Sequence, residues 1–434
     1  MILIYSHKIT PRLNYIFKTI FLDILQVNVA FTNRIEAFEN SENVKINYST
    51  TPLNSGLFFQ SSPLLFETGI KEQTITIFEF EGNTCFFKVG KDSQFPFDPF
   101  AASFYLISRY EEYLPHINDK DERFLASESL AFQNNFLATP VVNYWINAIE
   151  KKVETHYPNF KFKKRTFKFI PTIDIDNAYA YRHKGFIRIT GGLLKSLLKE
   201  HNFMKRLKVI LGQLPDPYDT FNYQHEIHKK YNTSPIYFFL LGDYGLNDKN
   251  IPVKNKTFIS LIKSISDYYE VGIHPSHASN YNLKTLSTEI RRLQNITHRK
   301  TTKSRQHFLK LNFPNTYRHL IDNNIQADYT LGYSEKNGFR ASICNPFYFY
   351  DIDTEVETKL KLYPFTLMDA TFQYYEKSSP EIATTQIKEF IQKVKDVNGT
   401  FISVWHNESL SDEGIWEGWK KVYEQMLNES LNNK

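Results

Sequence analysis

The feature that most constrains the fold is the alternation of short apolar strands and helices that begins near Phe167. We expect strands at 167–176, 234–243, 268–274, 326–330 and 399–406, and helices near 191–211, 256–269, 283–297, 314–323, 381–396 and 416–430. Alternation of this kind sustained over most of a chain favours an α/β layered fold or a barrel.

The first 160 residues follow a different pattern and predict a separate, smaller α/β domain. They combine an opening strand, Ile2–Tyr5, with an amphipathic helix near 11–23, short alternating strands at 74–80 and 84–87, and helices at 101–114 and 141–157. A chain of 434 residues is long enough for two or three domains. We therefore divide it into an N-terminal domain of unknown role, 1–160, and a second domain, 165–432, joined by the basic stretch 161–165. The aromatic-rich N-terminal part predicts a fragment that folds on its own.

Composition and charge exclude several classes of protein. A hydrophobic share of 41% and a charged share of 23% exclude a disordered chain. A net charge of +5 without a long basic run makes nucleic acid an unexpected partner. Cys85 and Cys344 are too few for a disulfide framework, which favours a reducing compartment.

The apolar first thirty residues raise the question of a membrane segment. Lys8, Arg12, Lys18 and Asp23 interrupt them, so no apolar run reaches the ~18–20 residues of a span. No signal-peptide core followed by a small-residue cleavage site is present either. We therefore expect a cytoplasmic protein of undetermined oligomeric state.

Carboxylates interrupt the first strand of the second domain. Asp174 and Asp176 share one face of this strand, because side chains alternate along it. Two like charges this close repel unless a cation lies between or beside them. A metal ion bound by one carboxylate would leave the other free to act as a base, although turn formation alone also explains such a pair.

Imidazole and guanidinium groups follow the later strands. His274 and His277 come just after the strand 268–274, Arg305 and His307 lie in Ser304–His307, and His406 ends the strand 399–406. Imidazole and carboxylate are ordinary ligands of zinc or a similar divalent ion. Arginine can orient a carboxylate, and a strand-end histidine can act as a general acid.

In their order, these motifs resemble those of the polysaccharide deacetylase family, carbohydrate esterase family four. The family's T-F-D-D motif resembles Thr172–Asp176, its second strand resembles Ile236–Gly242, its H-E-I-G-N-H-[ST]-x-x-H motif resembles Tyr269–His277, its R-x-P-[YF] motif resembles Arg305–Phe308, and its closing hydrophobic-x-H motif resembles Val404–His406. The resemblance covers about residues 165–430. Gly338–Ala341 and the aromatic segment 99–113 also resemble segments of a bacterial subgroup, whose members carry an uncharacterised N-terminal domain before the deacetylase-like one.

The resemblance implies a distorted (β/α) barrel that removes an N-acetyl, or less readily an O-acetyl, group from a carbohydrate. Its substrate would be an acetylated oligo- or polysaccharide or a glycan precursor. One divalent metal, zinc by preference, would be held by Asp176, His274 and a further histidine. In catalysis, Asp174 would be the base, oriented by Arg305, and His406 would be the acid. Asp369, which lies outside the motifs, would align His406.

The sequence departs from the family pattern at three places. One extra residue separates the two aspartates, and His277 falls one position early, where the family has its second histidine at the position of Ala278. His307 replaces a proline of the family, so His277 and His307 are equal candidates for the third ligand. An insertion of roughly fifty residues after the first motif includes Asp216–Asp219, and we expect it to shape the rim of the substrate site.

Two other functions remain open. A sugar-binding pseudoenzyme of the same fold is compatible with the irregular second motif. A metal-dependent glycosyltransferase with a D-x-D pair is also possible, and Asp351 and Asp353 form a second such pair. No nucleotide-binding signature precedes either pair, which disfavours the glycosyltransferase.

Overall fold

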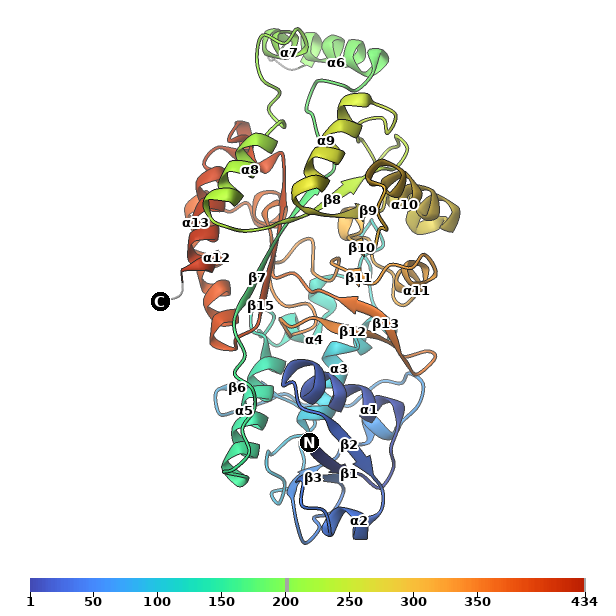
Figure 1. The fold of residues 1–434 in the computed structure, drawn as a ribbon, viewed down its shortest axis with the longest axis vertical. Coiled ribbons are helices and arrows are strands. Elements are labelled where there is room, and N and C mark those ends of the chain that lie inside the picture. The colour runs from blue at the N-terminus through green and yellow to red at the C-terminus, as the bar shows by residue number, and fades with distance from the viewer. Residues whose placement is uncertain (200–202, 433–434) are drawn as a thin grey trace.

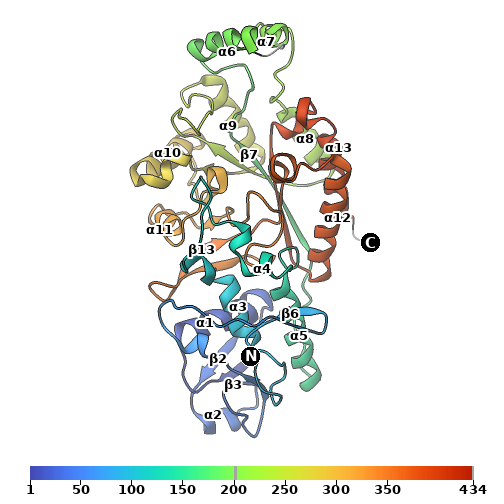
Figure 2. The ribbon, with the colours of Figure 1, turned by 180° about the vertical axis from the view of Figure 1, so that it is seen from behind.

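The computed structural model describes residues 1–199 and 203–432. Its main elements are two largely parallel sheets covered by helices (Figures 1 and 2). The N-terminal unit and the second unit lie at successive levels of an elongated molecule, and helices α6 and α7 stand at the end opposite the N-terminal unit. The prediction of an α/β fold is confirmed.

The N-terminal unit is built on a four-stranded parallel sheet in the order β2-β1-β3-β4. Its strands are β1 (Ile2–Tyr5), β2 (Val29–Thr32), β3 (Val44–Ser49) and β4 (Leu57–Gln60), and a hairpin of β5 (Phe78–Phe80) and β6 (Asn83–Cys85) follows. Its helices are α1 (Pro11–Phe17), continued by a π-helix (Lys18–Ile24), α2 (Ile35–Glu39), α3 (Pro99–Ile107), α4 (Leu130–Gln133) and α5 (Val141–His156).

Helix α3 shows how the sequence sets these boundaries. The Asp98 carboxylate caps its first turn by accepting the N–H groups of Phe100 and Ala101 at 3.0 Å, and Pro99 occupies the first helical position. The helix ends before Arg109, whose backbone is left-handed with φ 54°. The expected helix 101–114 is therefore too long at its C-terminal end.

The second unit contains a nine-stranded sheet in the order β12-β13-β11-β10-β9-β8-β7-β15-β14, in which only the β12–β13 pair is antiparallel. Its strands are β7 (Lys168–Ile175), β8 (Ile236–Leu240), β9 (Glu270–His274), β10 (Lys303–Ser304), β11 (Ala327–Asp328), β12 (Phe347–Asp351), β13 (Val356–Leu362), β14 (Leu367–Met368) and β15 (Thr400–His406). Its helices are α6 (Phe186–Lys199), α7 (Phe203–Ile210), α8 (Phe221–Lys230), α9 (Lys256–Tyr268), α10 (Leu283–Thr297), α11 (Asn315–Asp322), α12 (Pro380–Asp396) and α13 (Trp419–Leu431).

The strand ladders of the described residues form an open sheet and not a closed barrel. One edge is the hairpin strand β12, and the other is the two-residue strand β14, and no ladder joins them. Single backbone hydrogen bonds do connect the segment between β13 and β14 to its neighbours. Phe365 N donates to Leu331 O, after β11, at 3.1 Å, and Thr366 N donates to Ile402 O, in β15, at 2.9 Å. The expected barrel is therefore not closed by strand pairing among the described residues, and only these irregular backbone contacts bridge the gap.

The two units share buried contacts. One hydrophobic cluster runs from β1 and α1 of the N-terminal unit into β12 and β13 of the second unit. A buried ionic group also joins them, because Glu112 accepts hydrogen bonds from Arg109 Nε at 2.7 Å and from Arg340 Nη2 at 2.6 Å. Independent folding of residues 1–160 stays a prediction.

No helix in the part of the chain that the structure describes has the length and apolar character needed to cross a bilayer.

The Glu112 contacts generate the first prediction. Glu112→Gln would leave the buried guanidinium of Arg340 without its carboxylate partner, whereas Arg109 would keep its ion pair with Glu111 at 2.7 Å. Breaking a buried pair in this way costs about 3–5 kcal/mol. We expect a loss of this size in the free energy of unfolding, measured by urea titration of the full chain. Glu154→Gln is the control, because Glu154 pairs with the exposed Lys161 and such pairs contribute about 0–1 kcal/mol. Equal losses in the two variants would contradict the structural role of Glu112.

Candidate active site

Polar side chains gather where the central parallel strands of the second unit end. Asp174 is the penultimate residue of β7, and it lies in register with His406, the last residue of β15. His274 is the last residue of β9, and Arg305 follows β10. Because parallel strands end at the same edge of a sheet, residues separated by over two hundred positions meet here.

Asp174 is held by a buried arginine. Arg305 Nη1 donates to Asp174 Oδ1 at 2.9 Å and to Thr172 Oγ1 at 2.6 Å, and its Nε donates to the Tyr329 carbonyl at 2.9 Å. The guanidinium also lies over the Phe238 ring, 4.8 Å from its centroid. Asp174 is therefore fixed in orientation, with Oδ2 directed toward His274 Nε2 at 4.0 Å.

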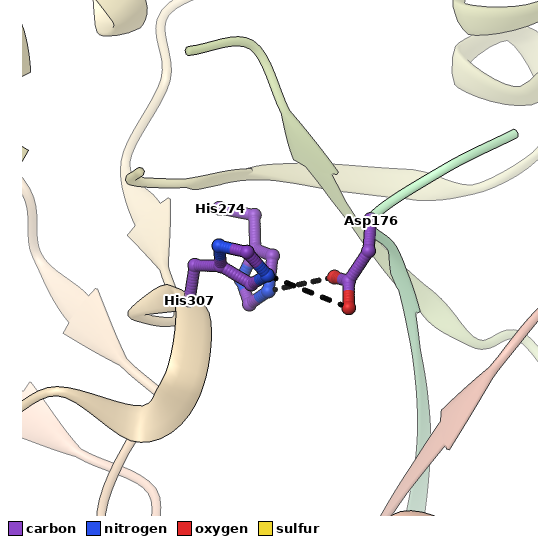
Figure 3. A group of neighbouring side chains, drawn as sticks. All are labelled: Asp176, His274 and His307. Atoms are coloured by element: carbon purple, nitrogen blue, oxygen red, sulfur yellow. Dashed lines mark ion pairs between the residues drawn. The ribbon is translucent and has the colours of Figure 1, made fainter. Parts of the chain in front are cut away.

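Asp176, His274 and His307 form a compact group in which one potential ligand atom from each residue lies within 4.8 Å of the others (Figure 3). Asp176 Oδ1 is 3.1 Å from His274 Nε2, and Asp176 Oδ2 is 3.6 Å from His307 Nε2. The imidazoles approach the carboxylate from the same side, from the end of β9 and from the turn His307–Leu309.

The second nitrogen of each imidazole is already engaged. His274 Nδ1 contacts the Arg305 carbonyl at 2.5 Å, and His307 Nδ1 contacts Asp248 Oδ1 at 2.8 Å. A carbonyl or carboxylate partner assigns the proton to Nδ1, which leaves Nε2 of each neutral ring with a lone pair. Both lone pairs then point at Asp176.

This arrangement fits a divalent cation. Asp176 Oδ1 is buried and has no hydrogen-bond donor within the described residues. A carboxylate and two imidazole lone pairs at such short separations are all acceptors, and a bound cation would satisfy them together. Without a bound cation, the negative charge of Asp176 acts on the neighbouring His307 and His406 and favours their protonated forms. Although burial acts in the opposite direction, Asp176 and Asp248 raise the pKa of His307 to about 9.

His277, the other candidate third ligand, lies apart from this group. Its backbone N–H donates to Asp248 Oδ1 at 2.9 Å, whereas its imidazole packs near Tyr281 and Phe308. Asp248 thus contacts both the His277 backbone and the His307 ring. Sequence inspection missed Asp248, because it lies in the irregular loop between β8 and α9, where no motif marks it.

His406, at the end of β15, also lies next to Asp176. Its Nδ1 contacts Asp369 Oδ1 at 2.7 Å, its backbone N–H donates to Asp369 Oδ2 at 2.8 Å, and its Nε2 lies 3.8 Å from Asp176 Oδ2. Burial lowers the pKa of His406, but Asp369 and Asp176 outweigh burial and raise it well above its ordinary value. The dyad of Asp369 and His406 presents a single nitrogen, Nε2, to the site.

A cavity of about 160 Å³ opens over these residues. Its walls combine the polar group with apolar and aromatic side chains of the second unit and with one arginine of the N-terminal unit, namely Arg123, Asp174, Asp176, His274, Gln306, His307, Phe308, Leu309, Ser334, Met368, Ala370, Tyr374, Tyr375 and His406. One water molecule needs about 10–15 Å³ of such volume, so the cavity has room for a small acyl group. None of these lining side chains comes from the described part of the insertion after the first motif, and its role at the rim stays a prediction.

Arg123 is the contribution of the N-terminal unit to this cavity. Its Nη1 donates to the Phe308 carbonyl at 2.9 Å, and its Nη2 donates to the Tyr375 hydroxyl at 3.3 Å. The neighbouring Glu122 accepts a hydrogen bond from Lys310 Nζ at 2.9 Å. These contacts hold a strained turn, because Phe308 and Leu309 have φ values of 60° and 52°. The turn begins with His307.

The second D-x-D pair lies outside the cavity. Arg318 donates to Asp351 at 2.6 and 2.8 Å and to Asp353 at 3.1 Å, so that one guanidinium engages both carboxylates. This pair is a structural ion pair on the antiparallel edge of the sheet, where β12 ends.

Comparison with known sequences identifies only the first part of the chain. The model of a family of unknown function, DUF7033, matches residues 2–158. None of the curated proteins that were compared matches the sequence.

Comparison with solved structures gives distant similarities. A proposed polysaccharide deacetylase from Mycobacterium smegmatis aligns with a TM-score of 0.42 and 14% identity over 62% of this chain and 84% of its own. The polysaccharide deacetylase Bc1974 from Bacillus cereus aligns with a TM-score of 0.29 and 12% identity over 61% and 88%. A CE4-family pseudoenzyme from Bacillus anthracis aligns with a TM-score of 0.29 and 13% identity over 61% and 62%. Similarity at this level is too weak to assign an activity.

The geometry leads to a prediction about the third metal ligand. Because His307 Nε2 lies in the ligand group and His277 does not, His307→Ala should weaken zinc binding by at least the ~10- to 100-fold typical of changes in supporting groups. His277→Ala should leave the zinc dissociation constant nearly unchanged. Isothermal titration of metal-free protein with zinc measures both. The opposite ranking of the two variants would assign the ligand to His277.

Proposed function

We propose that this chain is a metal-dependent hydrolase that removes an acetyl group, an N-acetyl group by preference, from a carbohydrate. The observation that carries the proposal is the convergence of Asp176, His274 and His307 on one cavity, with Asp174 and His406 beside them. The resemblance of five sequence motifs to those of polysaccharide deacetylases supports the choice of an acetylated sugar. The small cavity, with its aromatic wall, is compatible with such a group.

Asp176, His274 and His307 would hold the divalent ion, for which zinc suits the donor set of one carboxylate and two imidazoles. A zinc ion there would supply a Lewis acid for the acetyl carbonyl and for the attacking water. Asp248 and the Arg305 carbonyl orient the two imidazoles by binding their Nδ1–H groups.

Asp174 is the proposed general base. Its Oδ1 is occupied by Arg305, so Oδ2 remains to accept the proton of the attacking water. The hydrogen bond from the buried guanidinium restricts rotation of the carboxylate. Arg305 is therefore a positioning residue in this scheme.

His406 is the proposed general acid. Asp369 binds its Nδ1–H, which directs Nε2 into the cavity. Protonated Nε2 would donate to the nitrogen that leaves as the carbonyl carbon–nitrogen bond breaks. The sugar amine then departs as a neutral group, and acetate is released.

The proposal predicts the behaviour of an Asp174→Asn variant. Removal of the base should lower kcat by about 10²–10⁴-fold, the usual contribution of general base catalysis. Zinc content should not change, because the three proposed ligands remain. The measurement is acetate release from N-acetylated oligosaccharides by zinc-loaded wild-type and variant protein, together with elemental analysis.

Three results would count against this scheme. Full activity of Asp174→Asn would remove Asp174 from the role of base. Loss of zinc from this variant would make it a ligand. Zinc-loaded wild-type protein that binds acetylated sugars but releases no acetate would be a sugar-binding pseudoenzyme.

A further inference from the structure

Helices α6 and α7 form a hairpin at the end of the molecule opposite the N-terminal unit, beyond α8 and α9 (Figures 1 and 2). The proposed hydrolysis assigns no role to this hairpin. Its described side chains do not line the cavity. Its surface is nevertheless unusual in two respects, apolar exposure and charge.

The exposed face of the hairpin is apolar. Phe186 and Ile187 are 82% and 84% exposed at the start of α6, and Leu194 is 61% exposed two turns later. Along a helix, these positions lie within one face. Met204 on α7 and Leu211 just after it are 60% and 62% exposed. Large apolar side chains exposed together in this way mark an interaction surface.

A neighbouring loop extends this surface. Arg188 donates to the carbonyl groups of Lys249 and Asn250 at 2.8 Å, and its guanidinium lies 4.2 Å from the centroid of the Tyr244 ring. In the same loop, Tyr244 is 61% exposed and Leu246 is 87% exposed. We call these seven exposed side chains the apolar tip: Phe186, Ile187, Leu194, Met204, Leu211, Tyr244 and Leu246.

The segment that carries most of the apolar tip is strongly basic. Residues 182–212 contain eight lysines and arginines and one acidic residue, Glu200, whereas the whole chain has a net charge of only +5. Lys205 and Lys208 are exposed on α7, where Lys205 also pairs with Glu413 at 2.5 Å. Apolar and basic side chains on one helical surface are characteristic of helices that lie in the interface of an anionic membrane.

We infer that the apolar tip docks the protein on an anionic lipid surface, with its apolar side chains among the acyl chains and its basic side chains at the headgroups. A second copy of the chain is a poorer occupant, because residues 182–212, with eight basic residues and one acidic residue, would meet a segment of the same charge. Docking at the tip keeps the active site near the membrane. Leu246 is two residues from Asp248, which binds His307, and two residues span at most about 7 Å.

Vesicle sedimentation with the full chain tests this inference without relying on hydrolysis. The protein should sediment with vesicles of equal parts phosphatidylcholine and phosphatidylglycerol, remain in solution with phosphatidylcholine alone, and dissociate as sodium chloride is added. The double variant Phe186→Ser/Ile187→Ser should partition at least about tenfold more weakly, because it loses two large apolar groups. Lys208→Gln should partition about fivefold more weakly.

Ile382→Ser is the matched control, since Ile382 is 53% exposed on α12, away from the tip. It should bind vesicles like wild type, and all variants should keep the wild-type circular dichroism spectrum and thermal midpoint. Absence of wild-type binding, equal binding to both vesicle types, or unchanged binding of the tip variants would overturn the inference. A dimer in sedimentation velocity that dissociates in the double variant, without vesicle binding, would instead assign the tip to a second copy of the chain.

Discussion

The buried guanidinium of Arg305 is the contact on which the geometry of the cleft depends. It connects β7, through Thr172 and Asp174, to the chain after β11, through the Tyr329 carbonyl. The carbonyl group of the same residue accepts the Nδ1–H of His274. Arg305 thus orients the proposed base with its side chain and one proposed metal ligand with its backbone. Replacement of Arg305 would remove the side-chain contacts that orient Asp174, whereas the backbone carbonyl that binds His274 is present in any residue at this position.

The N-terminal unit takes part in this geometry and is more than an appended domain. Glu122 and Arg123 bind the turn that begins with His307, and this turn has two consecutive non-glycine residues in the left-handed region. Such a backbone costs about 1–3 kcal/mol for each residue and needs surrounding contacts to persist. The N-terminal unit therefore supplies part of the support for a proposed metal ligand and one side chain of the cavity lining, Arg123.

Sequence patterns were informative where local periodicity determines position. Asp174, Asp176, His274 and His406 follow apolar strands, and strand alternation was enough to place them near one edge of a sheet. The choice between His277 and His307 could not be made in this way, because it depends on how the segments after β9 and β10 fold back. Asp248 and Arg123 were missed for a related reason, since both lie in irregular segments whose positions are set by tertiary contacts.

Prediction of the fold from the sequence was limited in the same way. Strands β7, β8, β9 and β15 were predicted because their apolar runs are clear, whereas the hairpin of β12 and β13 was missed. In β13, exposed or half-exposed residues outnumber buried ones, which weakens the apolar signal. The two-residue strand β14 carries no periodicity at all. The presence or absence of barrel closure depends on such short segments and therefore could not be read from the sequence.

The most direct test of this account is a crystal structure of the zinc-loaded protein with anomalous data collected at the zinc absorption edge. The account predicts one anomalous peak at about 2.0–2.2 Å from Asp176, His274 Nε2 and His307 Nε2, with Asp174 still bound to Arg305. A peak coordinated by His277 in place of His307, or the absence of a peak between Asp176 and His274, would contradict it.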